Sequence, residues 1–178
     1  MNKTVLTIVG IFAVGLLILY GFRGTTTGAA TAGEKSITWT DPGVAKATIA
    51  SGQKPIFLFV QTDWCTFCKK MKAETFADPA VQQQLNDRFV NITINPEKDG
   101  TARFTGQELS YAALASQLGV NGYPASFFFT PDGKLLGGQP GYIEPSLFAD
   151  LAEYIGGGYY TKYKFPEFQS LPKDQRAL

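Results

Sequence analysis

The chain has 178 residues, of which 44% are hydrophobic and 17% are charged, and its formal net charge is +1. This length suits one domain with extensions, and the near-neutral charge gives no reason to expect a nucleic acid as partner. With two cysteines and no histidine, one chain cannot complete a four-ligand zinc site from sulfur and imidazole. We expect no metal and no cofactor.

The first predicted element is an apolar segment. Residues 4–22 carry no charge and lie between Lys3 and Arg23. As a helix they would span about 28 Å, which is close to the thickness of a bilayer core. Residues 1–23 are therefore either a signal peptide or a signal anchor. We favour an uncleaved anchor, one transmembrane helix, because the apolar run is longer than a usual h-region of about 7–15 residues.

A linker and the first elements of a domain follow. Residues 24–34 are almost entirely Thr, Gly and Ala, which predicts a flexible linker. We expect the folded domain over residues 35–156. It begins with a short strand at 36–39 and a helix at 42–51, for which Asp41 is the expected N-cap.

The two cysteines lie at the predicted junction of a strand and a helix. The apolar run 56–60 reads as a buried strand, and a helix-permissive run, 65–76, follows it. A helix N-terminus carries partial positive charge and free N–H groups, which stabilise a thiolate. We therefore interpret Cys65 as the attacking thiol at the exposed helix start and Cys68, one turn further in, as the resolving thiol.

Two other interpretations of the cysteine pair remain. A structural disulfide over so short a loop removes little chain entropy and stabilises the fold poorly. The pair could also be two core cysteines brought together by chance. A Cys-x-x-Cys next to a βαβ pattern is typical of a redox motif, and we favour that interpretation.

The remaining predicted elements alternate between helices and strands. They are a helix at 80–86, a strand at 89–94, a loop at 95–103, a helix at 109–118 opened by a capping box at 105–108, strands at 125–130 and 134–136, and a last helix at 146–155. This order predicts an α/β fold with one mixed central sheet and helices on both faces.

Residues 157–178 form an aromatic C-terminal tail. We expect it to fold back over a sheet edge or a helix, with a partner-binding or membrane-surface patch as the alternative. Residues 173–178 are expected to be disordered.

Several motifs together resemble thioredoxin. They are Trp64-Cys65-x-x-Cys68-Lys69 after a strand, Gly122-Tyr123-Pro124 before a strand, and the Asp132-Gly133 turn. The run from Cys68 to Val81 resembles more specifically the periplasmic branch of the superfamily, represented by the C-terminal domain of DsbD and by SoxW-type thioredoxins. The resemblance covers about residues 37–155, and it implies a thioredoxin-like fold and a thiol:disulfide interchange activity.

The resemblance also implies roles for individual residues. Cys65 and Cys68 would be the catalytic cysteines and would form the redox disulfide. Pro124 would be cis and lie against them, whereas periodicity alone favours a trans turn proline. The residues expected to bind an extended substrate segment are Trp64, Tyr123, Pro124 and Ala125. The alternative for Trp64 is a half-buried core tryptophan.

Two positions depart from the resemblance. The family commonly has carboxylates six residues before and seven residues after the first cysteine, and here Phe59 and Lys72 occupy these positions. The proton acceptor for Cys68 is therefore not apparent. The lysines of the helix and its N-terminus favour a thiolate, so we expect the pKa of Cys65 to lie below that of free cysteine.

We therefore expect an exported, membrane-tethered thiol:disulfide oxidoreductase that reduces protein disulfides. It would lie on the periplasmic side of the inner membrane, anchored by residues 4–22, and act as a monomer. Its partners would be protein disulfide substrates and a thiol electron donor, for which a transmembrane reductase is a candidate. The alternatives are a non-catalytic binding or assembly module and a disulfide oxidase or isomerase.

Overall fold

The computed structural model describes residues 36–42, 54–104 and 107–176. The expected membrane segment at 4–22, the linker at 24–34 and most of the helix at 42–51 lie outside these residues. Among the helices that are described, none combines the length and apolar character that crossing a bilayer requires.

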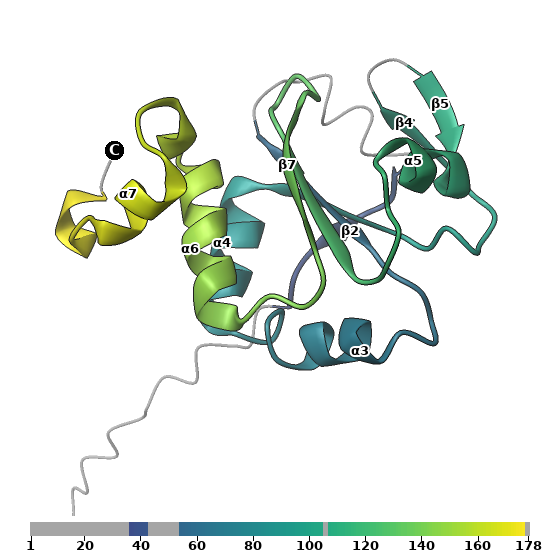
Figure 1. The fold of residues 1–178 in the computed structure, drawn as a ribbon, viewed down its shortest axis with the longest axis horizontal. Coiled ribbons are helices and arrows are strands. Elements are labelled where there is room, and N and C mark those ends of the chain that lie inside the picture. The colour runs from purple at the N-terminus through teal and green to yellow at the C-terminus, as the bar shows by residue number, and fades with distance from the viewer. Residues whose placement is uncertain (1–35, 43–53, 105–106, 177–178) are drawn as a thin grey trace, which may run out of the picture. The chain divides into compact units, whose positions relative to one another are not determined.

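The fold is built on a five-stranded sheet (Figure 1). Its strands, in spatial order, are β1 (Trp39–Thr40), β3 (Val90–Ile94), β2 (Ile56–Val60), β6 (Ala125–Phe129) and β7 (Leu135–Pro140). β1 and β2 run parallel to β3, whereas β6 is antiparallel to β2 and β7 is antiparallel to β6. The predicted mixed sheet is confirmed.

Strand β2 lies at the centre of the sheet, and all five of its side chains are buried. Successive side chains of a strand point to opposite faces. Phe57 and Phe59 accordingly belong to one apolar cluster, while Ile56, Leu58 and Val60 belong to another. An uninterrupted apolar run is typical of such a strand, because both of its faces are covered.

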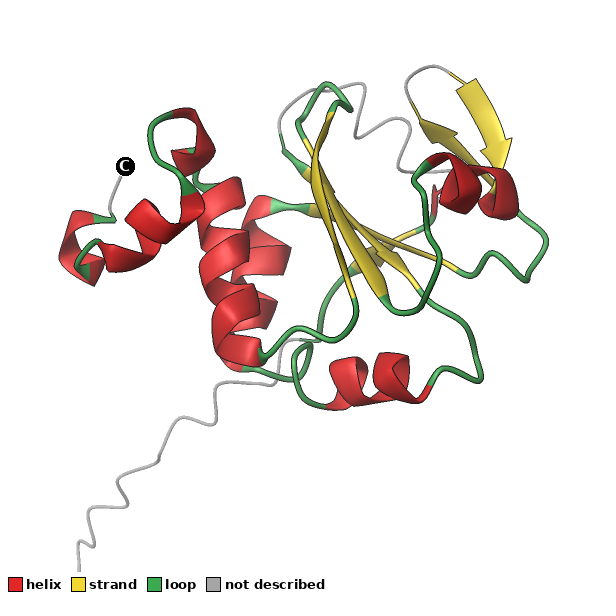
Figure 2. Ribbon diagram, in the orientation of Figure 1, coloured by secondary structure: helices red, strands yellow, loops and turns green. Residues whose placement is uncertain are grey.

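Helices cover both faces of the sheet (Figure 2). On the Phe57 face lie α3 (Thr66–Ala73), α4 (Pro79–Arg88) and α6 (Pro145–Gly156), and on the other face lies α5 (Tyr111–Gln117). The Asp78 side chain caps α4 by accepting hydrogen bonds from the backbone N–H groups of Ala80 and Val81, at 2.9 and 3.1 Å. This N-cap, followed by proline at the first helical position, is as the sequence predicts.

The loop predicted at 95–103 is confirmed for residues 95–100, but the predictions for residues 101–104 and 107–110 are wrong. Strands β4 (Thr101–Phe104) and β5 (Gln107–Ser110) form an antiparallel pair where a loop and a capping box were expected. The carboxylate of Glu108 accepts a hydrogen bond from Thr101 Oγ1 at 3.1 Å across the pair, so it does not serve a helix start. Ser110 caps α5 instead, through a 3.1 Å bond from the Ala113 N–H.

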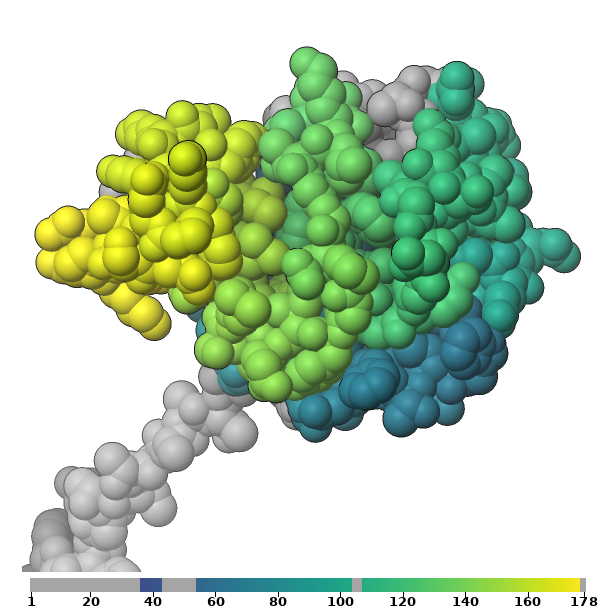
Figure 3. All heavy atoms as spheres, viewed as in Figure 1, coloured from purple at the N-terminus to yellow at the C-terminus, as the bar shows by residue number. Residues whose placement is uncertain are grey.

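The C-terminal tail folds back onto α6, as predicted. It contains the 3₁₀ helix η1 (Tyr159–Thr161), the helix α7 (Phe165–Ser170) and the 3₁₀ helix η2 (Lys173–Gln175). Phe168 is fully buried, and its ring centroid lies 5.3 Å from that of Tyr154 on α6. In Figure 3 the atoms of the tail pack directly against those of α6.

The expectation that residues 173–178 are disordered is wrong for residues 173–176. The Arg176 side chain is only 6% exposed and forms ion pairs with Asp150 at 2.9 Å and Glu153 at 3.4 Å. Its guanidinium also lies 4.6 Å from the ring centroid of Phe168. These contacts compensate the loss of hydration and hold the end of the tail on α6.

Candidate active site

The site begins where β2 leads into α3. Cys65 is the N-cap of α3, with extended backbone angles of φ −68° and ψ 109°. Its sulfur accepts a hydrogen bond from the backbone N–H of Cys68 at 3.0 Å. The sulfur therefore occupies the place of a capping oxygen, next to the partial positive charge of the helix start.

Cys65 and Cys68 are joined by a disulfide, with an Sγ–Sγ distance of 2.15 Å. The expectation that Cys65 lies at an exposed helix start needs correction, because Cys65 is only 3% exposed and Cys68 is fully buried. Both cysteines belong to the apolar cluster that includes Phe59, and Tyr123 packs against this cluster. The helix start is therefore covered by neighbouring side chains, although its N–H groups are placed as expected.

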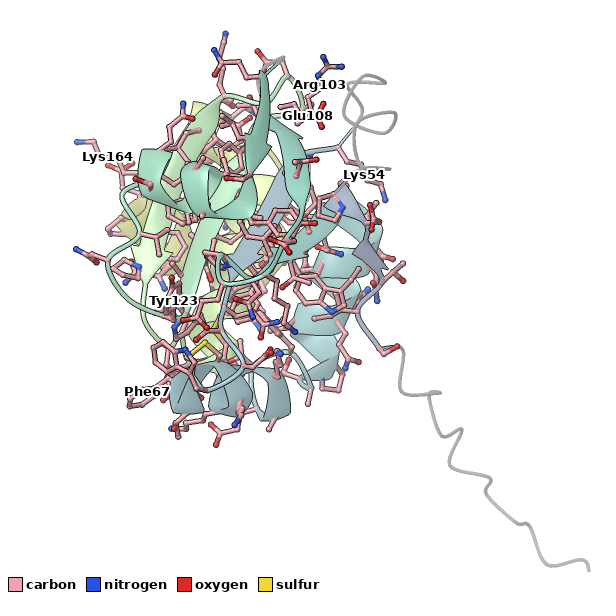
Figure 4. All side chains as sticks on the ribbon, turned by 90° about the vertical axis from the view of Figure 1, so that its right-hand side faces the viewer. Lys54, Phe67, Arg103, Glu108, Tyr123 and Lys164 are labelled. Atoms are coloured by element: carbon pink, nitrogen blue, oxygen red, sulfur yellow. A yellow bond between two sulfur atoms is a disulfide. The ribbon has the colours of Figure 1, made fainter. Side chains whose placement is uncertain are left out.

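Three aromatic side chains, which we call the aromatic rim, lie around the disulfide: Trp64, Phe67 and Tyr123. Trp64 is 63% exposed and Phe67 is 59% exposed, so Trp64 is not a core residue. The rings of Trp64 and Tyr123 meet edge to face, with centroids 5.9 Å apart. Figure 4 shows Phe67 and Tyr123 on the same side of the molecule as the disulfide. An exposed apolar surface of this kind is suited to contact with another molecule.

The Tyr123–Pro124 peptide bond is cis, as the resemblance implied. Pro124 and Ala125 are both buried. Ala125 is the first residue of β6 and lies between Val60 and Pro140 in the sheet. Its side chain is therefore not part of the exposed surface around the disulfide.

The loop after β3 contacts Asp63 and Trp64, the two residues before Cys65. The sequence alone assigned no role to this loop. The indole Nε1–H of Trp64 donates to the carboxylate of Glu97, at 2.9 Å to each oxygen. Asp63 pairs with Lys98 at 2.8 Å and accepts a 3.4 Å hydrogen bond from the Asn95 side chain. The hydrogen bond from Lys98 holds the pKa of Asp63 below its usual value.

The sequence held a signal for this contact. Residues Asn95 to Lys98 directly follow β3, and Asp63 and Trp64 follow β2. Because β2 and β3 are parallel neighbours, the segments after both strands emerge at the same edge of the sheet. Polar residues at these two places could therefore have been paired from the predicted topology.

Phe59 and Lys72, which stand where the family commonly has carboxylates, differ in burial. Phe59 is fully buried, with its ring centroid 4.9 Å from that of Phe76, whereas Lys72 is exposed.

Glu74 accepts a 2.6 Å hydrogen bond from the hydroxyl of Tyr142 and pairs with Lys70 at 3.7 Å. No group of three or more His, Cys, Asp or Glu side chains in the described ranges is arranged to hold a metal ion.

Comparison with known proteins identifies the family. The thioredoxin-like domain family matches residues 43–156. The thiol:disulfide interchange protein DsbD of Citrobacter koseri is 35% identical over 102 residues, which are 56% of this chain and 16% of that protein. The chain thus matches only about a sixth of the length of this relative.

Two solved structures agree with this assignment. A thioredoxin-fold protein from Helicobacter pylori has a TM-score of 0.58 at 22% identity, covering 65% of this chain and 76% of that one. A putative disulphide-isomerase from Bacteroides thetaiotaomicron has a TM-score of 0.52 at 25% identity, covering 70% of this chain and 96% of that one. The chain belongs to the thioredoxin-like domain family, as a disulfide oxidoreductase-type domain with the Cys65–Cys68 pair.

Proposed function

We propose that this protein is an exported, membrane-tethered thiol:disulfide oxidoreductase that reduces disulfides in other proteins. The observation that carries the proposal is the position of the Cys65–Cys68 disulfide. It lies at the start of α3, with the Cys65 sulfur in the N-cap position and the exposed aromatic rim beside it. A helix start lowers the free energy of a thiolate, and the thiolate is the nucleophile in disulfide exchange.

In the reduced protein, the Cys65 thiolate attacks one sulfur of the substrate disulfide. A mixed disulfide forms, and the other substrate sulfur leaves as a thiolate. Cys68 then attacks Cys65, which restores the Cys65–Cys68 disulfide and releases the second substrate thiolate. The protein loses two electrons and the substrate gains two, so a thiol donor must reduce the protein again before the next cycle.

The aromatic rim supplies the surface for the substrate. Trp64 and Tyr123 would contact the residues that flank the substrate disulfide. The segment around Pro124 and Ala125 would place an extended substrate chain next to the cysteines by strand addition. Since Ala125 is buried, its contribution would come from its backbone.

Reduction is favoured over oxidation because the resemblance is to carriers on the reductive side of disulfide exchange. DsbD is named a thiol:disulfide interchange protein, and an interchange activity is what the site chemistry supports. An isomerase is the second candidate, because one structural neighbour is described as a putative disulphide-isomerase. A transmembrane reductase remains the candidate electron donor.

The chain organisation is part of the proposal. Residues 1–23 would anchor the protein, residues 24–34 would act as a linker, residues 35–156 would form the redox domain and residues 157–178 would complete it. The domain would then lie on the periplasmic side of the inner membrane. A full-length chain that stays in the membrane fraction after carbonate extraction would support the anchor, and a soluble chain that starts near Gly33 would contradict it.

The activity is tested by reduction of insulin with dithiothreitol as the electron source. The wild type should accelerate precipitation of the insulin B chain, and Cys65→Ser should abolish this acceleration. Equilibration with glutathione then gives the redox potential, which sets the direction of electron flow in a given compartment. A wild type that does not accelerate the reaction would favour a non-catalytic binding module.

A further inference from the structure

One cavity of the described structure lies next to the redox helix. It has a volume of about 590 Å³ and is lined by residues of α3, β1, β2 and β3, among others. Its walls include the aromatic rings of Trp39, Phe59 and Phe76, and Thr93 contributes a hydroxyl without a hydrogen-bond partner in the described ranges. Lys72 is the only charged side chain among the described lining residues.

Lys72 lies four residues after Cys68 on α3. Residues at this spacing share a helix face, with Cβ atoms about 5–6 Å apart. Cys68 is fully buried and belongs to the same apolar cluster as Phe59 and Phe76, which line the cavity. The aliphatic stem of a lysine can line such a wall while its ammonium group stays at the rim. Lys72 is therefore the described cation that shares both the helix face of Cys68 and this cavity.

The charge of Lys72 is poorly compensated. Loss of hydration lowers its pKa, the nearby negative charge of Asp63 opposes this effect, and the positive charges of Lys69 and Lys98 add to it. Asp63 is itself paired with Lys98. Lys72 forms no ion pair in the part of the chain that the structure describes. The neighbouring Lys70, in contrast, pairs with Glu74 and lies 4.3 Å from the ring centroid of Tyr142.

We propose that Lys72 stabilises the thiolate of Cys68 during the resolving step. This inference rests on the proposed role of Cys68 as the resolving thiol. Lys72 acts through Cys68 and is therefore a positioning residue.

In the mixed disulfide, the Cys68 thiol gives its proton to water. The resulting thiolate attacks the sulfur of Cys65, the Cys65–Cys68 bond forms, and the bond between Cys65 and the substrate sulfur breaks. The substrate sulfur leaves as a thiolate and takes a proton from solvent. A cation one turn away favours the charged form of Cys68 without accepting the proton itself.

A direct test is the titration of Cys68 in a Cys65→Ser background, in which Cys68 is the only thiol. The thiolate absorbance is followed against pH in this background alone and with Lys72→Met, Lys72→Arg or Lys70→Met added. Lys72→Met should reduce the thiolate fraction at neutral pH by about three- to tenfold, an effect limited by solvent screening at the rim. Lys72→Arg should restore it, and Lys70→Met should change it by less than about twofold.

A kinetic test uses the intact cysteine pair and oxidised glutathione. Release of glutathione from the mixed disulfide should be about three- to tenfold slower in Lys72→Met at neutral pH, and the rates should converge at high pH, where Cys68 is fully ionised. A purely structural effect would slow the reaction equally at every pH. If the thiolate fraction of Cys68 follows the same pH dependence in Lys72→Met and Lys70→Met, the inference is wrong, even if the wild type reduces insulin. A wild type without reductase activity would overturn the proposed function instead, since the titration does not depend on turnover.

Discussion

The contact between Trp64 and Glu97 provides a quantitative test of the aromatic rim. The Glu97 carboxylate holds the indole N–H with two oxygens at 2.9 Å, and Trp64 remains 63% exposed. Glu97→Ala removes the acceptor and leaves the indole free to rotate away from Tyr123. Glu97→Gln keeps an acceptor oxygen without the charge. We therefore expect Glu97→Ala to weaken substrate docking more than Glu97→Gln does.

The expected loss of kcat/KM in Glu97→Ala follows from the strength of the hydrogen bond between Trp64 and Glu97. A bond to a charged group contributes about 1.5–3 kcal/mol, and solvent exposure reduces this to about 0.4–1 kcal/mol. If the bond is needed in the transition state of attack, kcat/KM should fall by about two- to fivefold. The loss should appear with a protein disulfide such as insulin, because a small aromatic disulfide does not need the rim.

The assay compares kcat/KM for insulin and for a small disulfide in the two Glu97 variants. The control is Glu108→Ala, which removes an exposed carboxylate from the β4–β5 pair, where it accepts from Thr101. Fluorescence of Trp64 in a Trp39→Phe background, which leaves one tryptophan, reports whether the indole has moved. If Glu97→Ala moves the indole but lowers insulin reduction no more than Glu108→Ala does, the orientation of Trp64 does not matter for docking.

Three further predictions concern other parts of the molecule. Cys68→Ser should accumulate mixed disulfides with substrate proteins while Cys65→Ser should not, as judged by non-reducing gels, and trapping through Cys68 alone would reverse the assigned roles. Arg176→Met should lower the free energy of unfolding in urea by about 2–3 kcal/mol, since Asp150 and Glu153 would lose their partner, and Lys173→Met is the exposed control. Phe59→Asp should speed release of the mixed disulfide by supplying a proton acceptor, at a cost of about 3–5 kcal/mol in stability. Phe59→Asn should share that cost without the faster release, and equal release rates in the two variants would contradict the argument.

The part of the fold nearest the cysteines could be predicted because local signals agree there. An apolar run for β2, a polar helix after it and the Asp78-Pro79 start of α4 all indicate the same topology. No local signal indicated the cis bond before Pro124. Periodicity favoured a trans turn proline, and only the resemblance to thioredoxin indicated the cis form.

The errors arose where a cross-strand or tertiary contact outweighs a local signal. Thr105 to Glu108 has the composition of a capping box, but the Glu108 side chain bonds to Thr101 on the paired strand. The end of the tail is polar and reads as disordered, yet Arg176 reaches Asp150 and Glu153 on α6. The partners of Arg176 lie 26 and 23 residues away, outside a local sequence window. Thr101 lies only seven residues from Glu108, so there the local pattern favoured a helix start over a strand pair.

The burial of Cys65 bears on how the site would select partners. The sequence predicts an exposed thiol at a helix start, yet in the disulfide form both sulfurs lie beneath apolar side chains while Trp64 and Phe67 are exposed. A thiol that attacks this disulfide must approach Cys65 through the aromatic rim, and apolar groups on the partner gain free energy there by leaving water. A small charged thiol gains little from that surface. Under the proposed function, the aromatic rim therefore discriminates between partners before any sulfur reacts, and the helix start then sets the reactivity of the sulfur that they reach.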